Sequence, residues 1–382
     1  MKKLFYKSSN NILILTGSIG SGHISVARAI TDALYRVDGK HIQVETVDLL
    51  TALANFVTFA AKKIYLGSLK ISPKIYELIF SQSDSSQWPL KILNALSAPF
   101  MQEKFLALLK EKQPRVLVST YPVWDILVKK VWKKYCGGRL PFVSVITDSM
   151  SVHNSWTYGE PDYFLVANED TAVTLRNLGI DPRRIKIFGY AISHDFEKHH
   201  SCLDFQQKWN LSPKRKTLLL VLSTGMAWSH IKQLVKTIQQ SRLKKLQLMV
   251  IACGSVGWEK RLKKMHFPWP TRITGWTNEM HTFIHGADMI LTKAGGATVM
   301  ECIASQKPMV IIDAIPGQEI GNAMLVQKYN LGVVLNRDLK DFDRSIDYLL
   351  NHEALVKKNL AAQQKPQAAE EIAKFLLSLA KI

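Results

Sequence analysis

The chain has 382 residues, of which 47% are hydrophobic, so it is long enough for two folded domains and does not have the composition of a disordered protein. Its 50 Lys and Arg against 31 Asp and Glu give a formal net charge of +19. Such a charge favours polyanionic partners, namely nucleic acid, an anionic membrane surface or phosphorylated ligands.

The cysteines and the apolar runs indicate the compartment. The four cysteines form no C-x-x-C pair, which argues against a structural zinc site or a disulfide framework and predicts a reduced, cytoplasmic protein. No apolar run of signal-peptide length follows MKKLFYKSSN. The most apolar long stretch, 49–61, is too short to cross a bilayer. We therefore expect a soluble or peripheral protein.

Runs typical of buried strands alternate with helical patterns along most of the chain. The first series of predicted strands is 11–17, 41–50, 115–121, 141–148, 163–168 and 184–192, with a mostly helical insertion at about 49–110. The second series is 217–225, 246–254, 271–276, 288–296, 308–317 and 332–335. An amphipathic helix is expected at the C-terminus. This alternation predicts an α/β protein with parallel sheets.

A polar segment without strand character, near 195–215, separates the two series. We expect an N-terminal Rossmann-like domain over 1–195, a C-terminal Rossmann-like domain over 196–365, and a helix over 366–382 that packs back on the first domain. Two such domains would enclose a deep cleft at the carboxyl ends of their strands, where open α/β sheets bind ligands.

The first glycine-rich loop, GSIGSGH at 17–23, leads into a helix. Gly20 and Gly22 permit close approaches that a Cβ would block, and they are candidates for the acceptor side of a site. The spacing G-x-x-G-x-G is not the dinucleotide fingerprint, although Glu45 or Asp48 could serve as a ribose acid. His23 at the helix start is either a general base or a cap of the turn, and its position does not decide between them.

The second half contains three further loops at strand ends. In the loop at 291–304, the N–H groups of a helix start suit a diphosphate, and Glu301 is placed either to reach ribose hydroxyls or only to complement the helix dipole. The turn at 316–322 carries amides and a carboxylate that suit a sugar. The loop at 223–225 suits a phosphate. The candidate residues are Thr224, Gly225, Gly295, Gly296, Ala297, Thr298, Gln318, Glu319 and Asn322.

The segment TDSMSVHNSW at 147–156 follows a strand of the first domain. Asp148, His153 and Trp156 are candidates for the acceptor side, although each residue by itself is more often structural. The D-x-D at 341–343 lies away from the strand ends, so we expect neither a catalytic zinc nor an obligate magnesium.

The segment at 55–80 combines aromatic residues with lysines, and acidic residues are nearly absent from 49 to 76. This pattern suits an anionic bilayer interface, but it also fits an ordinary amphipathic helix pair that covers a sheet.

Several of these segments occur in one order: GSIGSGHISVARAI, TDSMSVHNSW, GWTNEMHTFIHGADMILTKAGGATVMECIA and PGQEIGN. Together they resemble the monogalactosyldiacylglycerol synthase and processive diacylglycerol glucosyltransferase family. The resemblance implies an inverting GT-B glycosyltransferase in which His23 is the catalytic base. It also implies that Thr298, Glu301, Gln318, Glu319 and Asn322 hold a UDP-sugar, that the backbone at Trp276 meets the uracil, and that the insertion engages membrane and lipid.

The sequence therefore predicts transfer of galactose or glucose from a UDP-sugar to diacylglycerol at the inner face of a membrane, with anionic lipids as partners and without a cofactor or obligate metal. Alternatives are another lipid acceptor (polyprenyl-linked or sterol-like) or a different reaction on a UDP-sugar. A basic nucleotide-sugar-sensing or nucleic-acid-binding protein is a further alternative, but no helix-turn-helix or RNP-type motif supports nucleic acid as a partner.

Overall fold

A computed structural model describes residues 11–17, 22–39, 41–52, 101–122, 125–136, 140–198, 200–223, 226–315, 317 and 319–380. These residues divide into two compact units. Unit 1 runs to His194 and takes up the chain again from Gln367, and unit 2 covers Asp195–Pro366. Most of the insertion, including the aromatic and lysine-rich segment at 55–80, lies outside the described residues.

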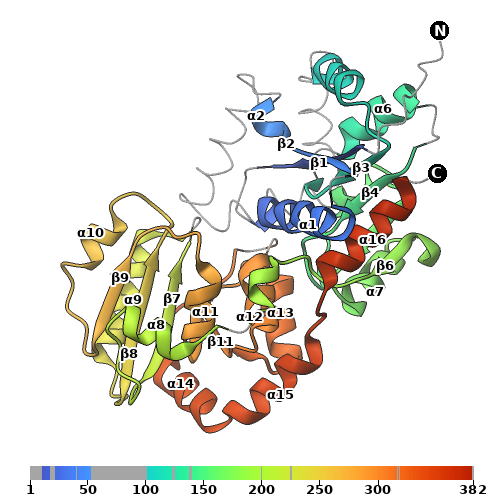
Figure 1. The fold of residues 1–382 in the computed structure, drawn as a ribbon. Coiled ribbons are helices and arrows are strands. Elements are labelled where there is room, and N and C mark those ends of the chain that lie inside the picture. Colours follow the sequence, from blue (N-terminus) through green and yellow to red (C-terminus); the bar gives the residue numbers. More distant parts are fainter. Residues whose placement is uncertain are drawn as a thin grey trace. The chain divides into compact units, whose positions relative to one another are not determined.

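Unit 1 is built on a sheet of six parallel strands in the order β2-β1-β3-β4-β5-β6 (Figure 1). Its strands are β1 (Asn11–Thr16), β2 (Gln43–Asp48), β3 (Val116–Ser119), β4 (Phe142–Val145), β5 (Tyr163–Val166) and β6 (Ile185–Ile187). Its helices are α1 (Gly22–Asp38), α2 (Leu49–Ala52), α6 (Asp125–Cys136), α7 (Glu169–Asn177) and α16 (Ala368–Ala380), and residues 101–112 are also helical.

Unit 2 also has six parallel strands, in the order β12-β11-β10-β7-β8-β9. They are β7 (Lys216–Leu222), β8 (Leu246–Ala252), β9 (Thr271–Thr274), β10 (Met289–Lys293), β11 (Met309–Asp313) and β12 (Gly332–Val334). Its helices are α8 (Cys202–Lys208), α9 (Trp228–Gln240), α10 (Trp258–Leu262), α11 (Met280–Gly286), α12 (Gly296–Ala304), α13 (Ile320–Lys328), α14 (Phe342–Asn351) and α15 (Glu353–Gln363). The predicted strands and the parallel α/β class are confirmed.

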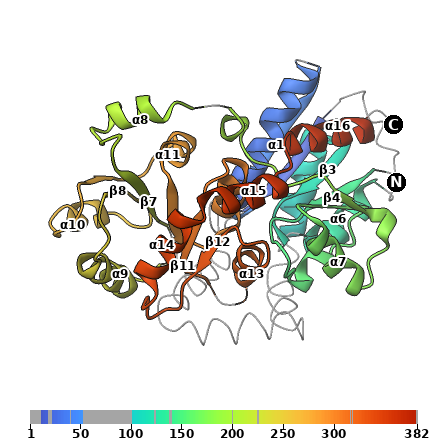
Figure 2. The ribbon, with the colours of Figure 1, turned by 90° about the horizontal axis from the view of Figure 1, so that it is seen from below.

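The C-terminal helix α16 packs against α1 in unit 1, and the two helices lie side by side in both views (Figures 1 and 2). Both helices bury a stripe of alanines and larger aliphatic residues, and small side chains let two helix backbones come close. Arg36 of α1 pairs with Glu370 of α16 at 3.1 Å, and Arg115 donates to the carbonyl of Ala380 at 3.2 Å. The last helix is thus part of the first unit.

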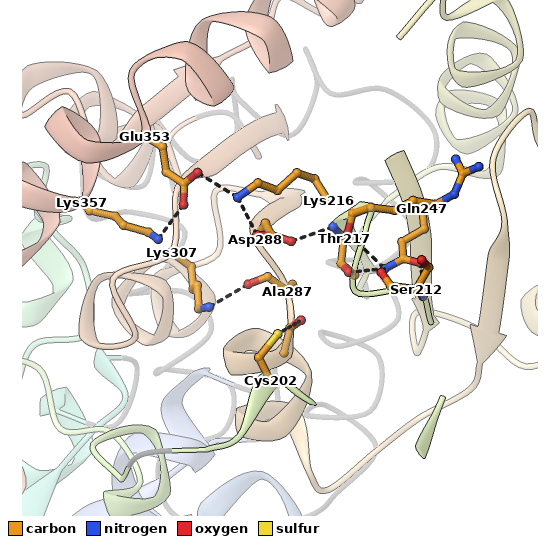
Figure 3. A network of polar contacts seen from close by, with 12 residues as sticks. Cys202, Ser212, Lys216, Thr217, Gln247, Ala287, Asp288, Lys307, Glu353 and Lys357 are labelled. Carbon is orange, nitrogen blue, oxygen red and sulfur yellow. Dashed lines mark hydrogen bonds and ion pairs between the residues drawn. The ribbon is translucent and has the colours of Figure 1, made fainter. Parts of the chain in front are cut away.

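A polar network ties the amino-terminal edge of the unit 2 sheet to α15 (Figure 3). Lys216, at the start of β7, lies 3.0 Å from both Asp288 and Glu353. The second oxygen of Asp288 accepts from the N–H of Thr217 at 2.8 Å, and Lys357 pairs with Glu353 at 2.6 Å. The network stabilises the amino-terminal edge of the sheet. The carboxyl ends of the strands, and the loops that follow them, are at the opposite edge.

No helix within the described stretches is long and apolar enough to cross a membrane.

Asp125, the first residue of α6, is fully buried in unit 1. One carboxyl oxygen accepts from Ser144 at 3.2 Å, and the other has no hydrogen-bond partner. A Cβ on Gly159 would lie 2.5 Å from the Cβ of Asp125, so the close contact with Asp125 requires glycine at this position. Burial raises the pKa of Asp125 well above its usual value, and the nearby hydroxyl groups of Ser119 and Ser144 offset this only in part.

We expect Asp125→Asn to stabilise unit 1 at neutral pH. Because the folded pKa is raised, the folded state binds more protons, and the stability contributed by Asp125 falls as the pH rises above the unfolded pKa of about 4. The advantage of the amide should grow by up to about 1.4 kcal/mol per pH unit above that point. Urea unfolding at several pH values measures it. The exposed Asp32→Asn on α1 is the matched control, and an equal pH dependence in wild type and Asp125→Asn would contradict the assignment.

Candidate functional site

In each sheet the chain first adds strands on one side of the first strand. It then crosses over and adds the remaining strands on the other side. In unit 1 this crossover point lies between β1 and β3, and in unit 2 it lies between β7 and β10. In open α/β sheets, the loops that follow such strands diverge and leave a crevice at the carboxyl edge, where ligands bind. The described residues among those predicted for the site follow the carboxyl ends of strands in these two sheets.

His23 is the second residue of α1, directly beyond the β1 loop, and its side chain is buried. Its Nδ1 lies 2.7 Å from the carbonyl oxygen of Thr120 and 3.0 Å from the hydroxyl oxygen of Thr147. A carbonyl oxygen only accepts, so Nδ1 carries the hydrogen and donates it. The other ring nitrogen, Nε2, therefore keeps its lone pair in the neutral ring.

Burial lowers the pKa of His23 to about 4, and the hydrogen bond to the Thr120 carbonyl offsets only part of this effect. The imidazole is therefore neutral at pH 7. A neutral ring with an unprotonated Nε2 is the form that can take a proton from a hydroxyl. This state fits the general-base interpretation of His23; a cap would instead use the ring to satisfy N–H groups of its own turn.

Aromatic rings surround the imidazole. The ring of Tyr121 meets it edge-on at 4.8 Å between centroids, and the ring of Trp156 lies 6.3 Å away. A Cβ on Gly17 would lie 2.8 Å from the Tyr121 ring, so this position of the loop needs glycine for packing. Gly22 begins α1, and Gly20 lies outside the described residues. Packing near these rings agrees with the burial of the His23 side chain.

Asp148 and Trp156 are hydrogen-bonded to each other, and the Trp156 ring is the one that lies near His23. Nε1 of the fully buried Trp156 donates to Asp148 at 2.7 Å. Burial raises the pKa of Asp148 to about 6, although the bond from Trp156 acts in the opposite direction. His153 accepts the N–H of Ser155 at 3.1 Å and caps a short helical turn at Asn154–Thr157. All three residues therefore have structural partners, and acceptor contact by any of them stays a prediction.

In unit 2, α12 begins at the end of β10 without a capping side chain and without an acid in its first turn. The first N–H groups of a helix have no partner within it, and they carry the positive end of the helix dipole. Here they belong to Gly296, Ala297 and Thr298, and Gly295 precedes them in extended geometry. This helix start suits an anion such as a diphosphate. Thr224 and Gly225, after β7, lie outside the described residues.

Glu301 lies one turn further along α12. Burial raises its pKa to about 7, and within the described residues its carboxyl group has no hydrogen-bond partner. A desolvated carboxyl group without a partner is costly unless donors arrive. Two or more hydroxyl groups of a ligand would supply such donors.

The turn between β11 and α13 holds two further candidates. Glu319 is buried, forms an ion pair with Lys293 at the end of β10, and accepts the N–H of Ile315 at 3.0 Å. Both of its oxygens are therefore engaged within the protein. Asn322 donates to the carbonyl of Ala294 at 3.0 Å, while its own carbonyl oxygen is buried without a partner. Gln318 lies outside the described residues, and Trp276, between β9 and α11, is 70% exposed.

Sequence reasoning missed Thr120, Thr147, Tyr121 and Lys293. Each of them lies at or just beyond the carboxyl end of a strand, namely β3, β4 or β10. A polar or aromatic residue at such a strand end was the available signal, but it is a common one.

Three histidines gather in unit 2 without having been predicted to do so: the His200 ring lies 4.8 Å from that of His281 and 4.9 Å from that of His285. Across the described part of the chain, no group of three His, Cys, Asp or Glu side chains is arranged to hold a metal ion. The D-x-D acid Asp343 instead accepts from Ser241 and from the N–H of Arg242.

Two family models match the chain in succession. The model described as monogalactosyldiacylglycerol (MGDG) synthase matches residues 23–192, and the glycosyltransferase family 28 C-terminal domain matches residues 224–376. The first match lies in unit 1, and the second covers most of unit 2 and part of α16.

Known proteins agree with these models. The chain is 25% identical to the processive diacylglycerol beta-glucosyltransferase of Bacillus licheniformis, over 98% of this chain and 96% of that protein. The structure of Acinetobacter baumannii MurG matches with a TM-score of 0.58 at 10% identity, covering 96% of this chain and 99% of that one. The structure of Anabaena Alr3699/HepE in complex with UDP-glucose matches with a TM-score of 0.55 at 12% identity, covering 97% of each chain.

The structural matches identify the fold as GT-B, which confirms the predicted fold class. The two family models and the relative of nearly equal length agree with the sequence motifs that contain His23 and the start of α12. The chain therefore belongs to the family of the monogalactosyldiacylglycerol synthases and processive diacylglycerol glucosyltransferases.

Proposed function

We propose that this protein moves a hexose, galactose or glucose, from a UDP-sugar to diacylglycerol with inversion, giving a β-glycosyl-diacylglycerol. The order of the two matched domains supports this proposal, because one model is named for a diacylglycerol-glycosylating synthase and the other for a glycosyltransferase family. The relative from Bacillus licheniformis carries the name of a diacylglycerol glucosyltransferase.

The observation that carries the reaction type is the state of His23, a buried neutral imidazole with Nδ1 already occupied. In the proposed step, Nε2 takes the proton of the diacylglycerol hydroxyl while that oxygen bonds to C1 of the sugar. The bond from C1 to the diphosphate oxygen breaks, and its electron pair leaves with UDP. A single displacement of this kind inverts the configuration at C1.

Unit 2 supplies the donor contacts in this proposal. The N–H groups at the start of α12 meet the diphosphate and stabilise its developing charge without an obligate metal. Glu301 accepts from the ribose hydroxyls, and the backbone at Trp276 meets the uracil. Gln318, Glu319 and Asn322 hold the sugar, with the loop at 224–225 over the phosphates. Glu319 already has one partner on each oxygen and would accept a sugar hydroxyl in addition, since a carboxylate oxygen can accept more than one hydrogen bond.

On the acceptor side, we propose that the glycine loop with Gly20 and Gly22, together with Asp148, His153 and Trp156, shapes the approach of the lipid hydroxyl. The net charge of +19 supports peripheral binding to anionic lipids at the inner face of a membrane.

The first test offers labelled UDP-glucose and UDP-galactose with diacylglycerol liposomes. We expect wild type to form a glycosyl-diacylglycerol from at least one donor. His23→Gln keeps a side chain that can donate to the Thr120 carbonyl but lacks the base, so the turnover number should fall by about 10²–10⁴-fold. The exposed His41→Ala in the same unit is the matched control and should retain wild-type turnover.

Lack of a lipid product from either donor would contradict the proposed function. Transfer only to polyprenyl-linked or sterol acceptors in the same vesicles would favour the alternative acceptor class. Full turnover in His23→Gln would remove the general-base assignment and leave the reaction itself in place.

The second test measures UDP-glucose binding against pH, because the sugar diphosphate itself does not titrate near pH 7. In the ligand-free protein, Glu301 has a pKa of about 7. Ribose hydroxyls that donate to its ionised form would lower that pKa in the complex. Binding should therefore release a proton below pH 7, and affinity should weaken by up to about tenfold per pH unit as the pH falls. Calorimetry in buffers of different ionisation enthalpy measures both quantities.

Glu301→Gln should abolish this pH dependence and weaken binding at pH 7.5 by about tenfold, since a charged acceptor is lost. The exposed Asp347→Asn on α14 is the control and should leave the profile unchanged. A pH-dependent affinity that survives in Glu301→Gln would assign the titration to another group.

A further inference from the structure

A histidine base is often oriented by a carboxylate that accepts the hydrogen of its other ring nitrogen. His23 has no such partner among the described residues: the groups bonded to its Nδ1 are a carbonyl and a hydroxyl. Asp148 is adjacent in sequence to Thr147, but its carboxyl group accepts from Nε1 of Trp156. The orientation of the base must therefore come from uncharged groups.

Thr120 contacts both the ring and the backbone of His23. Its carbonyl oxygen accepts from Nδ1 at 2.7 Å, and its hydroxyl lies 3.2 Å from the backbone carbonyl of His23 and 3.3 Å from that of Leu15. Its own N–H donates to the same Leu15 carbonyl at 2.9 Å. Thr120 thus joins the end of β1, the end of β3 and the start of α1, and it sets the position of the ring relative to the sheet edge.

Thr147 approaches the ring from the end of β4. Its hydroxyl oxygen lies 3.0 Å from Nδ1, and the residue is 5% exposed. Since Nδ1 carries a hydrogen, the hydroxyl shares that hydrogen with the Thr120 carbonyl. The Thr120 carbonyl disfavours the alternative tautomer, in which the hydrogen would be on Nε2 and the carbonyl oxygen would face a nitrogen lone pair. The Thr147 hydroxyl can accept from Nδ1 in one tautomer or donate to it in the other, so it contributes to the position of the ring.

We propose that Thr120 and Thr147 form an uncharged clamp, the threonine clamp, that holds His23 with its hydrogen on Nδ1 and presents the lone pair of Nε2 to the acceptor hydroxyl. Both threonines are positioning residues that act through His23. The inference deepens the proposed function and rests on His23 being the base.

An uncharged clamp has a consequence that a carboxylate would not have. A buried carboxylate beside the ring would stabilise the imidazolium and raise the pKa of His23, so a larger share of the base would be protonated in the resting enzyme. The carbonyl and hydroxyl orient the ring without a charge, and the imidazole stays free at neutral and mildly acidic pH. When the ring takes the proton, both oxygens still accept from Nδ1 and stabilise the cation by hydrogen bonding.

The experiment uses the full chain with Thr120→Val, Thr147→Val and the double variant, because valine matches threonine in shape and lacks the hydroxyl. Ser at each position restores the hydroxyl and serves as the conservative variant. We expect the turnover number to fall about tenfold in each valine variant and about 10²-fold in the double variant, with KM for the UDP-sugar within about twofold of wild type. Both serine variants should recover most of the loss. Thr31→Val on α1 is the control for loss of a partly buried hydroxyl elsewhere in unit 1.

A second measurement does not depend on turnover. Nitrogen-15 NMR of the His23 ring should place the hydrogen on Nδ1 in wild type at pH 7. In Thr147→Val and in the double variant the Nδ1 signal should shift because one of its two oxygen partners is lost, while the hydrogen stays on Nδ1 with the Thr120 carbonyl as acceptor. Hydrogen on Nε2 in wild type, or wild-type turnover together with an unchanged Nδ1 signal in the double variant, would overturn the clamp. If wild type transfers no sugar, the proposed function fails, and the ring spectra still decide whether the clamp exists.

Discussion

Parallel pairing on both sides of the first strand of each sheet is the constraint on which the rest of the structure depends. In unit 1, β1 pairs with β2 on one side and β3 on the other, so the loop after β1 leaves the sheet beside Thr120. In unit 2, β7 stands in the same relation to β8 and β10, and the start of α12 comes to the corresponding edge. Hydrogen bonding of the strands thus decides where the loops meet, and the loops hold the candidate chemistry.

The same edge geometry supports two different electrostatic environments. Around His23 the direct partners of the ring are uncharged, and burial keeps the base neutral. Around α12 the buried Lys293–Glu319 ion pair and Glu301, which has no hydrogen-bond partner among the described residues, lie close to a helix start that itself favours anions. Uncharged surroundings suit a base that removes a proton. Charged side chains together with the N–H groups at the start of α12 suit a phosphorylated ligand. The division of labour proposed for the two units follows from this difference.

Much of the candidate site could be predicted because glycine-rich loops between a strand and a helix have few structural uses. The positions of His23 and of the α12 start follow from that pattern alone. The partners of each side chain could not be predicted in the same way. Glu319 stood out as a sugar ligand, yet Lys293 and the Ile315 N–H occupy its oxygens. His153 and Trp156 stood out through the family motif, and in the structure one caps a turn and the other is fully buried.

The sequence by itself determined the strands, the parallel α/β class, the family and the loops that carry His23 and Glu301, because hydrophobic periodicity and glycine spacing are local properties. Only the tertiary structure decided that Thr120 and Thr147 meet the imidazole, that burial holds His23 neutral, and that no described residue bonds to the carboxyl group of Glu301. These outcomes depend on residues about a hundred positions apart that come together at a sheet edge. Desolvation and hydrogen-bond partners arise only from such contacts, and they set the protonation state on which the chemistry depends.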